Sequence, residues 1–157
     1  MRALVALGLL AAMASVATAG AARSSVLVIR LKSVETSSRI VRNEPPSRLS
    51  KGDVVAERDN LFNVARQLGK PAGALVGTDK ATITFVSEAK ATVAGSTSFP
   101  GGTITFRGKV SFTSTRPVSL RIVGGTGRYA HATGTVTEPA TDNDPKNARN
   151  TYRITLP

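Results

Sequence analysis

Three short segments place carboxylates beside apolar residues and are the strongest candidates for acid–base chemistry. They are Gly52-Asp53, Asp59-Asn60-Leu61 and Gly77-Thr78-Asp79. A carboxylate at the edge of an apolar cavity can rise in pKa and act as a general acid or base, or stabilise a cationic intermediate. The alternative is turn chemistry, in which an aspartate accepts hydrogen bonds from nearby backbone N–H groups. The residues alone favour turn chemistry for Asp53 and Asp79 and leave both alternatives open for Asp59.

A glycine-rich segment, RIVGGTGRYAHATGTV, is the second candidate site. Gly125 to Ala130 follow a strand-like run and fit the pattern GxGxxA of a dinucleotide-binding turn. That motif requires a helix after the glycines, whereas Thr133 to Thr137 continue as a strand. We therefore interpret the segment as a tight turn between two strands, in which Gly124, Gly125 and Gly127 supply the backbone freedom.

Two further features carry little chemistry. His131 is the only histidine, and no serine or carboxylate lies at a motif spacing from it, so we expect it at the surface or rim of the fold. Asp142-Asn143-Asp144 is similar to a calcium loop but lacks the glycine and distal glutamate, which indicates a solvated hairpin tip. We expect neither a metal nor a cofactor.

Strands must position all of these residues, because apolar and polar side chains alternate with a period of two. In the clearest example, Thr103, Thr105, Arg107, Lys109 and Ser111 alternate with Ile104, Phe106, Val110 and Phe112. The same pattern covers residues 26–32, 81–85, 119–122 and 151–156, with turn residues between the runs. Only residues 59–68 also fit a short helix, or else an irregular strand. Regular short strands predict a β-sandwich or barrel, and a one-sided final strand favours closure.

The N-terminal residues 1–19 have the pattern of a secretory signal peptide. Arg2 precedes an uncharged apolar run from Ala3 to Val16, and Ala17-Thr18-Ala19 follows as a small-x-small cleavage site. The run is shorter than the roughly 20 apolar residues that a membrane helix needs. We therefore expect cleavage near Ala19 to Ala21, a secreted protein, and one β-barrel domain over residues 20–157. The absence of cysteine excludes disulfides and thiolate metal sites.

The chain is strongly basic, with 21 Lys and Arg against 10 Asp and Glu and a formal net charge of +11. Such a charge attracts anionic surfaces. Aromatic residues make up 4% of the chain, so we expect no specific nucleic-acid partner, since such proteins interleave aromatics with their cations. The cations are interpreted either as a solvated exterior or as a face that docks on an anionic surface polymer. That face comprises Arg30, Lys32, Arg107, Lys109, Arg121 and Arg153.

Five segments together resemble the allene oxide cyclase and dirigent barrel superfamily. They are KGDVVAERDNLFN, LVGTDKATITF, PGGTITFRGKVSF, RIVGGTGRYAHATGTV and TYRITLP, in order between Val26 and Pro157. The resemblance implies an all-β fold, an eight-stranded antiparallel up-and-down barrel with an apolar cavity, often assembled as a homotrimer. It also implies that the barrel confines a reactive hydrophobic small molecule and works by positioning.

The chain departs from these relatives at positions that carry their chemistry. The cyclases have a glutamate on the first strand and a cysteine after the VG turn, where this chain offers Arg30 and Lys32 and then Ala81 to Ile83. Dirigent proteins commonly follow the glycine turn with Ala-Arg-Gly, and here Ala132-Thr133-Gly134 removes the cation.

From the residues and the resemblance together, we expect a barrel that binds a hydrophobic small molecule and guides its cyclisation or isomerisation. The predicted catalytic pair is Asp59 and Asn60. The predicted ligand-binding residues are Asp53, Ile83, Phe85, Phe106 and Phe112. The alternatives are a small-molecule carrier or scaffold without turnover, and the polymer-docking surface described above.

Overall fold

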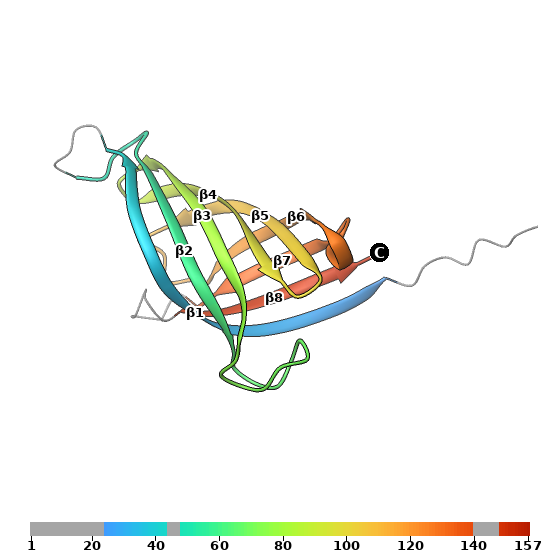
Figure 1. Cartoon of the computed structure of the whole chain (residues 1–157). Helices are drawn as coiled ribbons and strands as arrows, with labels where there is room; N and C mark the ends of the chain where they lie inside the picture. The colour runs from blue at the N-terminus through green and yellow to red at the C-terminus, as the bar shows by residue number, and fades with distance from the viewer. Residues whose placement is uncertain (1–23, 44–47, 140–147) are drawn as a thin grey trace, which may run out of the picture.

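A closed barrel of eight antiparallel strands forms the protein (Figure 1). The computed structural model describes residues 24–43, 48–139 and 148–157. Each strand pairs with the next along the chain and the last pairs with the first, which confirms the predicted up-and-down barrel. The strands are β1 (Ser25–Arg42), β2 (Val54–Asn63), β3 (Leu75–Ser87), β4 (Lys90–Phe99), β5 (Gly102–Ser111), β6 (Val118–Gly125), β7 (Thr133–Glu138) and β8 (Arg149–Leu156).

The period-two pattern determines which side chains enter the barrel. In β5, Ile104 and Phe106 are buried, whereas Thr105 between them and Arg107 and Lys109 beyond them are exposed. Successive residues of a strand point to opposite faces of a sheet, so this alternation divides each strand into an apolar inner face and a polar outer face. Of the alternatives for residues 59–68, the strand is the one observed, since β2 continues to Asn63.

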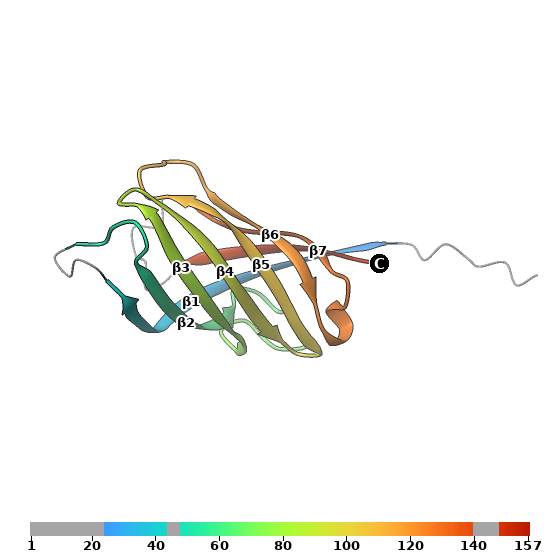
Figure 2. The same ribbon diagram turned by 90° about the horizontal axis from the view of Figure 1, so that it is seen from above.

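The barrel has two unlike ends. Because neighbouring strands run in opposite directions, the β1–β2, β3–β4, β5–β6 and β7–β8 connections lie at one end, here named the mouth end, and the remaining connections lie at the other, the floor end. Figure 2 shows β3, β4 and β5 running side by side between these ends. The floor end holds most of the fully buried side chains, namely Ile29, Leu31, Leu61, Ile104, Ile122, Tyr129, Tyr152 and Ile154.

Aromatic packing closes the floor. Phe99 packs edge-on against Tyr152, with ring centroids 5.2 Å apart, and contacts Tyr129 at 5.8 Å. Tyr129 is 0% exposed and comes from the short 3-10 turn η1 (Gly127–Tyr129). The glycine-rich segment therefore places the ring of Tyr129 inside the floor end of the barrel. This explains why the β6–β7 connection is longer than the tight turn predicted from the sequence.

The three glycines predicted to form the turn, Gly124, Gly125 and Gly127, occupy different environments. Of these three, Gly127 has a positive φ, of 58°. Gly124 and Gly125 belong to β6, and a side chain at Gly125 would meet the backbone oxygens of Thr103 and Tyr129, whereas nothing lies within 4 Å of one at Gly124. His131, which follows, is exposed and has a φ of 60°. The glycines thus serve architecture at the floor, away from the mouth end.

No helix in the described part of the chain is long and apolar enough to cross a membrane. The predicted leader, residues 1–19, and the Asp142-Asn143-Asp144 segment both lie outside the described residues.

Candidate functional site

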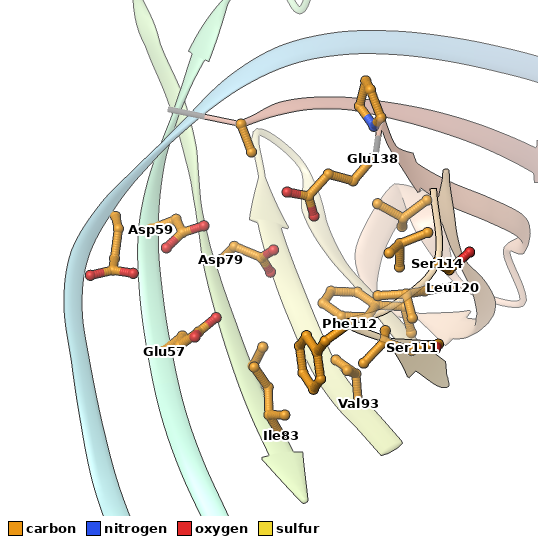
Figure 3. A pocket seen from close by; sticks show the side chains of 18 of the residues that line it. Glu57, Asp59, Asp79, Ile83, Val93, Ser111, Phe112, Ser114, Leu120 and Glu138 are labelled. Carbon is orange, nitrogen blue, oxygen red and sulfur yellow. The ribbon is translucent and has the colours of Figure 1, made fainter. Parts of the chain in front are cut away.

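A cavity of about 390 Å³ opens at the mouth end of the barrel. Its volume falls within the range of about 300–1,000 Å³ typical of small-molecule pockets. Apolar side chains from β3 to β7 form most of its wall, namely Ala81, Ile83, Val93, Phe106, Val110, Phe112, Val118, Leu120 and Val136. Figure 3 shows Ile83, Val93, Phe112 and Leu120 around one part of this space and carboxylates around another.

Three of the carboxylates form a row across adjacent strands. In the barrel register, Glu35 of β1 lies directly opposite Asp59 of β2, and Asp59 lies directly opposite Asp79 of β3. Directly opposed residues have Cβ atoms about 4.5–5.5 Å apart, and like charges at that distance repel. The row therefore concentrates negative charge at one side of an apolar cavity.

Buried hydroxyl groups hold two members of this carboxylate row. Ser33 donates a hydrogen bond of 2.6 Å to Oδ2 of Asp59, and Thr97 donates one of 3.1 Å to Oδ1 of Asp79. Both hydroxyl-bearing side chains are buried, one on β1 and the other on β4. Each aspartate is thus oriented by a neighbouring strand, as a preorganised site requires.

Burial raises the pKa of Asp79 from 3.8 to about 7. The hydrogen bond from Thr97 opposes this shift, and the negative charge of Asp59 adds to it. Desolvation disfavours the ionised form of a carboxyl group, and a nearby negative charge does the same. Asp79 consequently exchanges its proton near neutral pH, which is the range that suits a general acid or base.

Two more carboxylates border the same cavity. Glu57 lies two positions before Asp59 on the inner face of β2, and its pKa is raised by burial and by the charges of Asp59, Glu35 and Glu138. Glu138 comes from β7 across the barrel, and Figure 3 shows its carboxylate directed toward Asp79. Among the described residues, Arg116 is the only basic side chain that lines the cavity. A strongly basic protein therefore encloses an acidic interior.

The structure brings together four of the predicted site residues and separates the other three. Asp59, Ile83, Phe106 and Phe112 line the cavity. Asn60 lies on the outer face of β2, opposite Val34 and Thr78, because neighbouring residues of a strand face opposite ways. The predicted catalytic pair is thus divided between the two faces of the barrel wall.

The last two predicted residues, Asp53 and Phe85, are buried and stabilise the fold outside the cavity. Asp53 is buried in the turn before β2, where its Oδ2 accepts hydrogen bonds of 2.6 Å from the N–H and 3.2 Å from the hydroxyl of Ser50. Phe85 is buried two residues beyond Ile83 in β3 and stacks on Phe112, with ring centroids 5.4 Å apart. Neither of them lines the cavity.

The alternation of inner and outer side chains along the strands identifies three site residues that were not predicted from the sequence. Glu35 follows Leu31 and Ser33 in steps of two along β1, which extends well past residue 32, so the first strand does carry a glutamate on its inner face. Glu57 is in phase with Asp59, and Glu138 is in phase with Val136. Asp79 lies within β3 and not in a turn, although its Oδ1 does accept a hydrogen bond of 3.0 Å from the N–H of Lys80.

The site combines an apolar wall with proton-donating and proton-accepting groups. Within the described ranges, no group of three or more His, Asp or Glu side chains is arranged to hold a metal ion. The arrangement can protonate a bound molecule through Asp79 and can stabilise positive charge that develops beside Asp59. The apolar wall can hold the rest of the molecule in one conformation, away from bulk water.

Comparison with known proteins identifies related sequences and folds. A family model described as dirigent-like protein matches residues 20–156. A comparison with curated proteins finds no match. Among solved structures, a pyocyanin demethylase is 18% identical with a TM-score of 0.64, and the match covers 82% of this chain and 99% of that chain.

Two further solved structures have the same barrel. A pterocarpan synthase dirigent protein is 22% identical over 85% of this chain and 89% of that chain, with a TM-score of 0.59. A Diels–Alderase from Streptomyces koyangensis is 21% identical with a TM-score of 0.64, and the match covers 83% of this chain and 63% of that chain. At these levels of identity the similarity establishes the fold.

Proposed function

This chain belongs to the dirigent-like protein family, and we propose that its barrel binds a hydrophobic small molecule at the mouth-end cavity and guides the cyclisation of that molecule by proton transfer. The observation that carries the proposal is the register of Glu35, Asp59 and Asp79, which sets three carboxylates in a row on one side of an apolar cavity.

The chemistry follows from the unequal environments of the two aspartates. Asp79, with a pKa of about 7, transfers its proton to an oxygen of the substrate. Positive charge then develops on the substrate, and the carboxylate of Asp59, held by Ser33, stabilises it. As the ring bond forms, the substrate loses a proton, which returns to the Asp79 carboxylate. No atom is gained or lost, so the overall reaction is an isomerisation.

The apolar wall determines which ring forms. Phe106 is 2% exposed and Ile83 packs against the core, so this part of the wall is held in place by its neighbours. A wall of fixed shape selects one folded conformation of a flexible substrate and excludes water from it. Two of the similar structures bear names of ring-forming proteins, a pterocarpan synthase dirigent protein and a Diels–Alderase, and this supports the proposed reaction class.

Native mass spectrometry of the protein purified from its producing cells tests the proposal. We expect a co-purifying small molecule, and a product of equal mass but different retention time after incubation. The Asp79→Asn variant should retain the molecule and leave it unconverted, whereas Asn60→Ala, a neighbour on the outer face, should behave as the wild type. Release of an unchanged molecule from the wild type would support a carrier without turnover.

The finer parts of the proposal concern export and assembly. We expect the mature domain to begin near residue 20, after removal of the leader, and to assemble as a homotrimer, as the family resemblance implies. N-terminal sequencing of the exported protein and light scattering of its purified form measure these two properties. A mature protein that retains Met1, or a monomer at micromolar concentration, would contradict them.

A further inference from the structure

Acidic and basic side chains are separated between the inside and the outside of the barrel. Of the seven acidic residues in the described ranges, five line the cavity and Asp53 is buried in a turn. The seventh, Glu88, lies in the β3–β4 turn and pairs with Arg48, with Nη1 3.1 Å from Oε1. Consequently, the outward faces of β3 to β8 carry no carboxylate among the described residues.

Four cations gather on this outer surface, which carries no carboxylate among the described residues. The basic wall, as we name it, consists of the exposed residues Arg107 and Lys109 of β5, Arg121 of β6 and Arg153 of β8. Arg107 lies directly opposite Arg121, and Arg121 and Arg153 both lie opposite Thr135. Like charges in directly opposed positions destabilise a sheet, and a polyanion that neutralises both removes that cost.

A groove of about 450 Å³ runs beside the basic wall over β3 to β6. One transverse row of the register contains Thr82, Ala94, Arg107 and Arg121, and the small side chain of Ala94 leaves a hollow between larger neighbours. Thr82, Thr84 and Thr92 line one side of the groove together with Val93 and Ala94, and the cations line the other. Hydroxyl groups both donate and accept hydrogen bonds, as sugar hydroxyls do.

We propose that the basic wall and its groove bind an anionic polysaccharide, a glycan that bears carboxylate, sulfate or phosphate groups. The cations match the anionic groups of such a polymer, and Thr82, Thr84 and Thr92 can exchange hydrogen bonds with its hydroxyl groups. Arg107 and Arg121 project from the outer face, so this surface is separate from the cavity and its binding does not depend on the function proposed for the cavity.

Two other classes of polyanion fit the surface less well. The outward residues of β3 to β8 include no aromatic side chain in the described ranges, and single-stranded nucleic acids are bound by stacking on aromatics. An anionic membrane is bound by large apolar side chains such as Trp, Phe and Leu together with cations, whereas the apolar side chains that line the groove among the described residues are the small Val93 and Ala94.

Affinity for dextran sulfate, measured by calorimetry at physiological salt, tests this proposal. The wild type should bind dextran sulfate and should bind neutral dextran and duplex DNA at least tenfold more weakly. The double variant Arg107→Ser/Arg121→Ser should bind dextran sulfate at least tenfold more weakly, with the slope of log affinity against log salt reduced by about two. The matched control Arg39→Ser/Arg66→Ser removes the same charge elsewhere on the surface and should lose less than threefold.

A second variant separates the groove from simple charge. Thr82→Val keeps the shape and charge of the surface and removes one hydroxyl, so it should weaken dextran sulfate binding by a few-fold. Thermal unfolding of each variant establishes that it is folded. Equal losses in the two double variants, no binding of dextran sulfate by the wild type, or equally tight binding of duplex DNA would each overturn the proposal.

Discussion

Replacement of Asp79 by Asn should make the protein more stable at alkaline pH. The folded state holds the proton of Asp79 more tightly than the unfolded chain, because burial raises its pKa from 3.8 to about 7. Between these two values the folded state binds more protons than the unfolded state, so the free energy of unfolding falls as the pH rises through this window. An asparagine at this position has no charge to bury, and its amide oxygen can still accept the hydrogen bond from Thr97.

The magnitude follows from the pKa shift. Moving a pKa from 3.8 to about 7 corresponds to about 4 kcal/mol if the whole shift is expressed in stability. Asp79 borders an open cavity, where water screens its charge, so we expect roughly half of this, about 2 kcal/mol. For a domain of this size that difference raises the unfolding temperature of Asp79→Asn above that of the wild type by roughly 6 °C.

Urea unfolding of both proteins at a series of pH values from 4 to 8 measures this effect. The stability difference between Asp79→Asn and the wild type should grow by about 2 kcal/mol across the series. Glu88→Gln is the control, because Glu88 is exposed in a turn and no burial disfavours its charge. A stability difference that stays constant with pH, or an Asp79→Asn variant that is less stable than the wild type at pH 8, would refute the conclusion that burial raises the pKa of Asp79 toward neutrality.

Three further predictions concern the site and the floor. Thr97→Val should raise the pKa of Asp79 further, because it removes a hydrogen bond to the ionised carboxylate. Thr97→Ser keeps this hydrogen bond and should leave the pKa of Asp79 unchanged. The chemical shift of the Asp79 carboxyl carbon, followed against pH, measures both. Gly125→Ala should lower the free energy of unfolding by more than about 2 kcal/mol, because the new Cβ would meet two backbone oxygens. Nothing lies near a Cβ at Gly124, so Gly124→Ala should lower it by less than about 1 kcal/mol. Urea unfolding measures both values. Phe106→Ala should lower the free energy of unfolding by about 3–5 kcal/mol, because Phe106 is 2% exposed. Phe112 is 55% exposed, so Phe112→Ala should lower it by less than about 1 kcal/mol. Similar losses in the two variants would contradict the positions of these two rings in the cavity wall.

The fold was accessible from the sequence because the alternation of side chains is regular in most strands. Residues 103–112 show the pattern without interruption, and the structure places them in β5 with Ile104 and Phe106 inside. The glycine-rich segment was correctly separated from a dinucleotide-binding turn, because Thr133 to Thr137 lie in β7. Its 3-10 turn was not predicted, since the burial of Tyr129 depends on contacts with Phe99 and Pro100 from a distant part of the chain.

The site was less accessible because it depends on register. No local pattern indicates that Glu35, Asp59 and Asp79 lie opposite one another, since the pairing of strands is set by their packing and connections. A bulge between Glu35 and Ser37 also interrupts the alternation next to the first of these residues. Asn60 was wrongly predicted to share the site with Asp59. Because the two residues are adjacent in a strand, their side chains lie on opposite faces of the barrel wall.

Charge selectivity of the cavity tests the central claim most directly. Fluorescence titrations at pH 8 would compare acridine orange, a planar cation, with anilinonaphthalene sulfonate, an anion that also contains fused aromatic rings. The carboxylate row predicts that the cation binds at least tenfold more tightly, although the protein has a net charge of +11. Because Glu35, Glu57 and Glu138 remain, Asp59→Asn/Asp79→Asn should reduce this preference at least threefold. Tighter binding of the anion inside the cavity, or a preference for the cation that is unchanged in the double variant, would contradict the proposed role of the carboxylate row.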